Sequence, residues 1–164
     1  MILYMADSTL CERLTSLGFV PDEKVSVRRQ IRLQERGTIY IMELRPEMKC
    51  LAYKVDGNII KGTQTEKCDY LVLVTHDNLW GEVFVELKGS NISHAVKQVI
   101  ATLNNPLFKT SVHSLRRARI VTANRIPSNT GISVVERAKA DLRKLGCEFR
   151  VVKSMQPDIL KLKK

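Results

Sequence analysis

The first half of the chain is dominated by positions that alternate between apolar and polar, a pattern typical of β-strands. The alternating segments are, in chain order, VSVRRQIRL, TIYIMEL, CLAYKV and NIIKG. The last two meet across the turn signal Asp56-Gly57, a pair of residues that favours tight hairpin turns. We interpret the four segments as a β-meander.

Two apolar runs further along the chain, CDYLVLV (68–74) and EVFVELK (82–88), predict a pair of adjacent strands joined by the polar loop THDNLWG. Because successive side chains of a strand point to opposite faces, Glu86 and Lys88 are expected on the same face. In an antiparallel pair the first residue of one strand lies opposite the last residue of the other. This geometry predicts that Asp69 lies beside Glu86 and Lys88.

Three segments have the period of an amphipathic helix. The first ends at Gly18, a residue that often caps helices, and the second ends at Asn104-Asn105-Pro106. The expected helices cover residues 9–18, 92–103 and 133–145, and further strands are expected at 118–123 and 147–152. This order predicts an α/β fold, a single domain over residues 1–164 whose central mixed β-sheet is flanked by helices on its faces.

The composition is that of an ordinary globular domain, with 44% hydrophobic and 27% charged residues. The four cysteines form no CxxC pair, which argues against a zinc cluster and against a disulfide framework. No apolar run approaches the roughly 18 residues of a membrane-spanning helix, and the start of the chain lacks the basic region of a signal peptide. We therefore expect a cytoplasmic protein with no membrane partner.

The charge balance indicates an anionic partner. The chain has 27 Lys and Arg residues against 17 Asp and Glu, a net charge of +10, and such an excess attracts polyanions, most commonly a phosphate backbone. A merely solubilising surface is the alternative explanation of the charge alone. The basic residues concentrate at Lys24, Arg28, Arg29, Arg32 and Arg36, at Arg116, Arg117, Arg119 and Arg125, and at Lys161, Lys163 and Lys164.

The carboxylates of Asp69 and Glu86 and the amine of Lys88 suit a metal-dependent hydrolysis. Mg²⁺ prefers oxygen ligands and is often held by one or two carboxylates together with phosphate oxygens of a substrate, and Mn²⁺ is an alternative. A metal can acidify a bound water and stabilise a leaving oxygen, while a lysine can orient the water, neutralise charge or act as a general base. The chemistry indicated is phosphodiester hydrolysis.

At these residues the sequence resembles the PD-(D/E)XK nuclease superfamily, which includes many type II restriction endonucleases and Holliday-junction resolvases. The resemblance consists of Asp69, sixteen intervening residues, Glu86-Leu87-Lys88 and a following helix that carries Gln98. It implies a restriction-endonuclease-like αβββαβ core, here with a C-terminal αβ extension. It also implies that Asp69, Glu86 and the Leu87 carbonyl bind the metal, that Lys88 is the catalytic lysine, and that Gln98 assists at the site.

The acid-x-Lys triplet alone is not distinctive, because the chain contains two more, and these differ from Glu86-Leu87-Lys88 in their sequence context. They occur at residues 22–24 and 47–49, in each case after a proline and without a following amphipathic helix. The superfamily often adds a glutamate from its first helix, for which Glu12 is the candidate. Glu12 points away from the apolar face of that helix and fits a Thr9-x-x-Glu12 capping box, the interpretation we favour. Thr102 occupies the position where some branches have a tyrosine after the glutamine.

These observations predict a metal-dependent nuclease, most specifically an endonuclease that acts on DNA. Two alternatives remain open. One is a module of the same fold that binds nucleic acid without cleaving it, and the other is a basic adaptor domain for an acidic protein partner. A double-strand cut requires two sites, which makes a homodimer attractive.

Overall fold

The computed structural model of the chain describes residues 8–62, 65–76, 78–87, 91–110, 112–123 and 130–160. Its helices are α1 (Leu10–Ser16), α2 (Ile92–Asn104), the short 3₁₀ helix η1 (Pro106–Phe108) and α3 (Thr130–Lys144). Its strands are β1 (Glu23–Val27), β2 (Gln30–Glu35), β3 (Thr38–Glu43), β4 (Lys49–Lys54), β5 (Tyr70–His76), β6 (Leu79–Leu87), β7 (Arg116–Thr122), β8 (Glu148–Lys153) and β9 (Pro157–Ile159).

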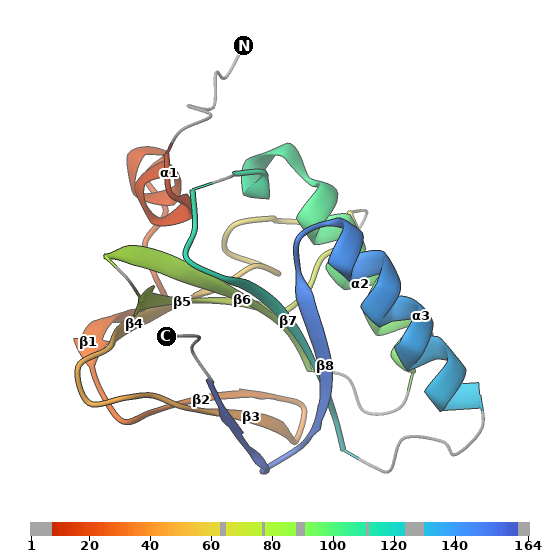
Figure 1. The fold of residues 1–164 in the computed structure, drawn as a ribbon. Helices are drawn as coiled ribbons and strands as arrows, with labels where there is room; N and C mark the ends of the chain where they lie inside the picture. The colour runs from red at the N-terminus through yellow and green to blue at the C-terminus, as the bar shows by residue number, and fades with distance from the viewer. Residues whose placement is uncertain are drawn as a thin grey trace.

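A six-stranded mixed sheet with the order β1-β4-β5-β6-β7-β8 lies at the centre of the molecule (Figure 1). The strands from β1 to β6 in this order are antiparallel neighbours, whereas β6, β7 and β8 are parallel. Parallel neighbours need a crossover connection, which α2 and α3 provide. The β5–β6 turn is tight, because His76 pairs with Leu79. Both strands therefore extend into the segment that the sequence predicts as a loop.

The three α-helices contribute to one apolar cluster on one face of this sheet. The cluster contains Leu10 and Leu14 of α1, Val99 of α2, Leu142 of α3 and Phe84 of β6. The predicted helices are confirmed within a few residues at each end, because burying an amphipathic stripe is what stabilises a surface helix. No helix in the described ranges is long and apolar enough to cross a membrane.

The opposite face of the central sheet is covered by a second sheet, β2-β3-β9 (Figure 1). Ile31 of β2 and Met42 of β3 belong to the same buried cluster as Val83 and Val85 of β6. The predicted α/β class and mixed sheet are confirmed, but within the described ranges the α-helices cover only one face of the central sheet. Alternate residues of β2 are buried and exposed, as expected for a strand with one face on the core and one in solvent.

The first four alternating segments do not form the predicted meander. Residues 25–33 are divided at Arg28 and Arg29, because β1 pairs with β4 in the central sheet whereas β2 pairs with β3 in the second sheet. Residues 58–62 contain only an isolated bridge between Asp56 and Ile60 instead of a strand. Alternation indicates which segments are extended but carries no information about which strands pair.

A buried polar network connects the two sheets. Arg119 of β7 is 1% exposed, and its Nε donates a hydrogen bond to Oδ2 of Asp158 on β9 at 2.8 Å. The hydroxyl of Tyr40 on β3 donates to the same oxygen at 2.5 Å. Burial, together with the neighbouring Asp158, raises the pKa of Tyr40 well above its ordinary value. Tyr40 therefore remains protonated and remains a donor.

Several arginines that the sequence predicts to grip phosphates are used inside the fold. Arg116 Nη2 lies 2.7 Å from Glu82 Oε1, in a pair whose side chains are 7% and 0% exposed. Arg117 and Arg119 both contact Oε2 of Glu148, at 3.3 and 3.1 Å. Their charges are thus offset by acidic partners. Arg125 and the three terminal lysines lie outside the described residues.

Candidate active site

A cleft of about 430 Å³ opens where β5 begins and β6 ends. Four residues singled out in the sequence line it: Asp69, Glu86, Leu87 and Gln98. They come from the start of β5, the end of β6 and helix α2. Lys88 lies outside the described residues.

Asp69 is held at the rim of the central sheet by backbone pairing on both sides. Its N–H donates to the Val85 carbonyl at 3.1 Å, and its carbonyl accepts from the Val55 N–H at 2.8 Å. Its carboxylate Oδ2 accepts a hydrogen bond from the backbone N–H of Leu87 at 2.8 Å. The carboxylate is therefore oriented towards the end of β6.

Glu86 lies opposite Asp69, as the antiparallel register predicts. Tyr70 pairs with Val85, so one further step along the ladder brings Asp69 to Glu86. Glu86 is 1% exposed and shares its face of β6 with Phe84, which packs in the helical cluster. A carboxylate so deeply buried is costly unless positive charge or hydrogen bonds compensate.

Cys68, the residue before Asp69, is fully buried. Burial raises the pKa of its thiol, and the nearby carboxylates of Glu86 and Asp69 raise it further, although a hydrogen bond with Thr102 acts in the opposite direction. Cys68 is thus a neutral thiol at physiological pH. Because the thiolate is the nucleophilic form of cysteine, Cys68 is unsuited to covalent catalysis.

Helix α2 brings Gln98 to the cleft and also anchors Lys67 and Cys68, the two residues that precede Asp69. The Gln98 amide Nε2 donates to the carbonyl of Lys67 at 3.2 Å. One turn later, the hydroxyl of Thr102 accepts from the backbone N–H of Cys68 at 2.8 Å and donates to the Gln98 carbonyl at 2.8 Å. Thr102 is fully buried, so a position noted as a departure from the family pattern fixes the backbone that carries Asp69.

The remaining wall of the cleft was not predicted. Glu35, Arg36 and Thr38 reach it from the turn between β2 and β3, and Asp56 and Asn91 also line it. Arg36 and Gly37 have positive φ values of 47° and 81°, which are typical of a tight two-residue hairpin turn. The sequence signals the turn through Gly37, but only the folding of the second sheet onto the first places this turn over the cleft.

Thr9 is the N-cap of helix α1, and Glu12 is its partner in the first turn. The Thr9 hydroxyl accepts from the Glu12 backbone N–H and also contacts the Glu12 carboxylate, both at 3.1 Å. The predicted cap at Thr9 is thus confirmed. Among the described residues that line the cleft, Glu12 does not appear.

The donors in the cleft fit a hard divalent cation held partly by its substrate. In the described part of the chain, no group of three or more His, Cys, Asp and Glu side chains could hold a metal ion. Mg²⁺ is commonly bound by one or two carboxylates plus waters and substrate phosphates, and Asp69 and Glu86 provide such a pair.

Comparison with known proteins assigns no family. No protein-family model, curated protein or solved structure matches the chain. Any functional assignment therefore depends on the chemistry and geometry of the cleft itself.

Proposed function

We propose that the protein is a metal-dependent nuclease that hydrolyses phosphodiester bonds, most specifically a DNA endonuclease of the restriction-endonuclease-like type. The observation that carries the proposal is the meeting of Asp69, Glu86, Leu87 and Gln98 in one cleft. The chain order also supports it: α1, the antiparallel strands β4, β5 and β6, helix α2, and β7 parallel to β6. With β1, β2 and β3 between α1 and β4 left aside, this order is similar to the αβββαβ order that the resemblance implies.

In this proposal Asp69 and Glu86 hold Mg²⁺ or Mn²⁺ together with the Leu87 carbonyl. The bound metal would supply a Lewis acid for the scissile phosphate and an acidified water. The Leu87 N–H orients the Asp69 carboxylate, and burial of Glu86 lowers the dielectric around the site. Both effects strengthen electrostatic stabilisation of the transition state.

Lys88 and Gln98 act on the attacking water. Lys88 lies outside the described residues, and in this proposal its amine would orient the water or take up its proton. Gln98 donates through its Nε2 to the Lys67 carbonyl, and its buried Oε1 has no hydrogen-bond partner among the described residues. In this proposal Oε1 would accept a hydrogen bond from the attacking water.

Arg36 is the basic residue among the described residues that line the cleft, which is also lined by the acidic residues Glu35, Asp56, Asp69 and Glu86. So acidic a cleft repels a phosphate until cations offset its charge. We assign Arg36, on the β2–β3 turn, to the substrate phosphate.

The test is cleavage of plasmid and linear DNA with Mg²⁺, with Mn²⁺ and with chelator. We expect metal-dependent cleavage that falls at least 100-fold in Asp69→Asn and in Lys88→Ala, an effect of the size that transition-state groups produce. The matched controls are Glu47→Gln and Lys49→Ala, because these two exposed residues belong to another acid-x-Lys triplet of the same chain and do not line the cleft. Mn²⁺ titration calorimetry without DNA should show weaker binding in Asp69→Asn than in Glu47→Gln.

Equal cleavage by wild type and both site variants would refute the assignment of the site. Binding of DNA without any metal-dependent cleavage would favour a non-cleaving module. Absence of salt-dependent binding to any nucleic acid would favour an adaptor for an acidic protein.

A further inference from the structure

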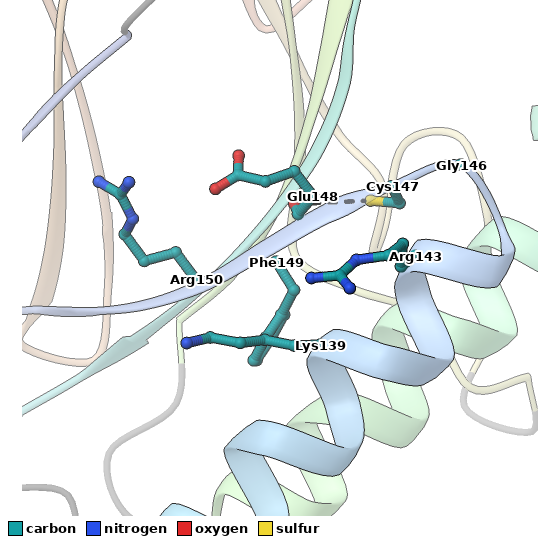
Figure 2. A pocket seen from close by; sticks show the side chains of 7 residues that line it. All are labelled: Lys139, Arg143, Gly146, Cys147, Glu148, Phe149 and Arg150. Carbon is teal, nitrogen blue, oxygen red and sulfur yellow. Dashed lines mark hydrogen bonds between the residues drawn. The ribbon is translucent and has the colours of Figure 1, made fainter.

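A second cavity, of about 490 Å³, lies between the C-terminal half of α3 and the edge strand β8. Lys139 and Arg143 of α3 and Arg150 of β8 border it, with Glu148 and Phe149 between them (Figure 2). Figure 2 shows the Lys139 and Arg143 side chains extending from the helix on the Phe149 side of β8, whereas Arg150 and Glu148 project from the other side of this edge strand. We call this cavity the α3–β8 groove.

The groove carries excess positive charge despite containing a carboxylate. Oε2 of Glu148 is contacted by Arg117 and Arg119 at 3.3 and 3.1 Å, so its charge is already offset from within the fold. The contact of Arg150 with Asp158 is long, 3.9 Å, and Arg150 is 52% exposed. Arg143 makes no ion pair with any described residue, and the pair of Lys139 with Glu136 is a solvent-exposed one, which binds weakly.

Two ordinary explanations cover only part of this arrangement. Basic residues in the last turn of a helix offset the negative end of its dipole, which accounts for Arg143 but not for Lys139, more than a turn earlier, or for Arg150 on a strand. Charged side chains also guard edge strands against pairing with other chains. Neither explanation requires cations from two elements to border one cavity.

The groove is close enough to the cleft to contact the same polymer. Glu86 is in register with Ile120 and Val151 on the two following strands, and Glu148 lies three residues before Val151. With roughly 3.3 Å per residue and 4.8 Å per strand, the two sites are about 14 Å apart along the sheet. This separation corresponds to about four base pairs of a duplex, at 3.4 Å each.

We propose that the α3–β8 groove binds backbone phosphates of the nucleic-acid substrate about four nucleotides from the cleft. The inference rests on the proposed nuclease function for its substrate class. Lys139, Arg143 and Arg150 act as phosphate contacts that position the polymer, and none of them touches the reacting atoms.

The experiment measures binding of a fluorescent 20-base-pair duplex in chelator, where no cleavage occurs, over a series of salt concentrations. Each lost phosphate contact reduces the slope of log K against log salt by about 0.9, and this weakens binding roughly eightfold at 0.1 M salt. The double variant Arg143→Ala/Arg150→Ala should therefore lose about two units of slope. The matched control is Arg137→Ala/Lys144→Ala, which removes the same charge from exposed positions that do not line the groove. Thermal midpoints of both variants verify folding.

If the groove and control variants lost the same amount of slope, the proposal would be overturned, because this would show that only net charge determines binding. Binding of polyglutamate through the groove as tightly as the duplex would also overturn it, in favour of an acidic protein partner. The nuclease proposal and the groove proposal can be refuted independently. Wild-type protein that binds through the groove but never cleaves would refute the nuclease alone, whereas cleavage and binding unaffected by Arg143→Ala/Arg150→Ala would refute the groove alone.

Discussion

Replacing Arg119 with methionine tests the buried link between the two sheets. Arg119 and Asp158 are 1% and 0% exposed as side chains, so Arg119→Met leaves a buried carboxylate without its principal cation while roughly preserving volume. The Tyr40 hydroxyl still donates to Asp158, but a neutral donor does not offset the charge. The protein should be strongly destabilised.

The expected loss is about 3–5 kcal/mol in the free energy of unfolding, the range found when one partner of a buried ion pair is removed. Domains are typically stable by only about 5–15 kcal/mol. For a chain of this length each kcal/mol corresponds to about 2–4 °C, so the thermal midpoint should fall by roughly 6–20 °C. The measurement is urea and thermal unfolding followed by circular dichroism.

Arg150 provides a matched control because it contacts the same carboxylate. Its side chain is 52% exposed, and its distance to Asp158 is 3.9 Å instead of 2.8 Å. Arg150→Met should therefore cost less than about 1 kcal/mol. The double variant Arg119→Met/Asp158→Leu should recover part of the loss, because it removes the uncompensated charge. Similar effects of Arg119→Met and Arg150→Met would refute the reasoning.

Three further changes test other contacts. Burial, only partly opposed by the ion pair, raises the pKa of Glu82 from 4.5 to about 7. The folded protein therefore binds this proton more tightly than the unfolded chain, and on the order of 3 kcal/mol of stability present below pH 4.5 is lost as pH rises through 7. In urea unfolding, the free energy of unfolding should be lower at pH 8 than at pH 5, and this difference should be absent in Glu82→Gln. The same difference in both proteins would contradict the assignment to Glu82. Thr102→Val should cost about 1–3 kcal/mol, since the buried N–H of Cys68 loses its acceptor, whereas Thr102→Ser should retain wild-type stability in thermal unfolding. Gly81→Ala should cost about 1–3 kcal/mol by overpacking, because a Cβ there would lie 2.8 Å from Leu115 Cγ, and truncation of Leu115 in the same chain should relieve this loss.

The parts of the fold that the sequence predicts are those encoded by neighbouring residues. Alternation places Val85 and Phe84 on opposite faces of β6, and the structure buries them in different clusters. The same alternation and a short connection are enough to bring Asp69 opposite Glu86. The main features of the candidate site were therefore predictable because they lie on one hairpin.

The parts that the sequence does not predict depend on pairing between distant segments. Nothing near β2 indicates that it leaves the central sheet, and nothing near β9 indicates that three residues pair with β3. Arg119 is an instructive case. Its charge suggests exposure, but its partner Asp158 is 39 residues away in the chain, and this partner compensates the cost of burying the charge.

The distribution of charge explains why net charge alone does not predict where a polyanion can bind. Each internal ion pair, such as Arg116 with Glu82 or Arg119 with Asp158, removes one positive and one negative charge, so the excess of +10 resides on the rest of the molecule. The cleft nevertheless carries more carboxylates than cations among its described residues. A polyanion attracted by the surface would thus meet a barrier at the proposed site until a metal ion is bound there. Because the barrier is electrostatic, Asp69→Asn should bind DNA more tightly than wild type in chelator, even though it cleaves less in Mg²⁺.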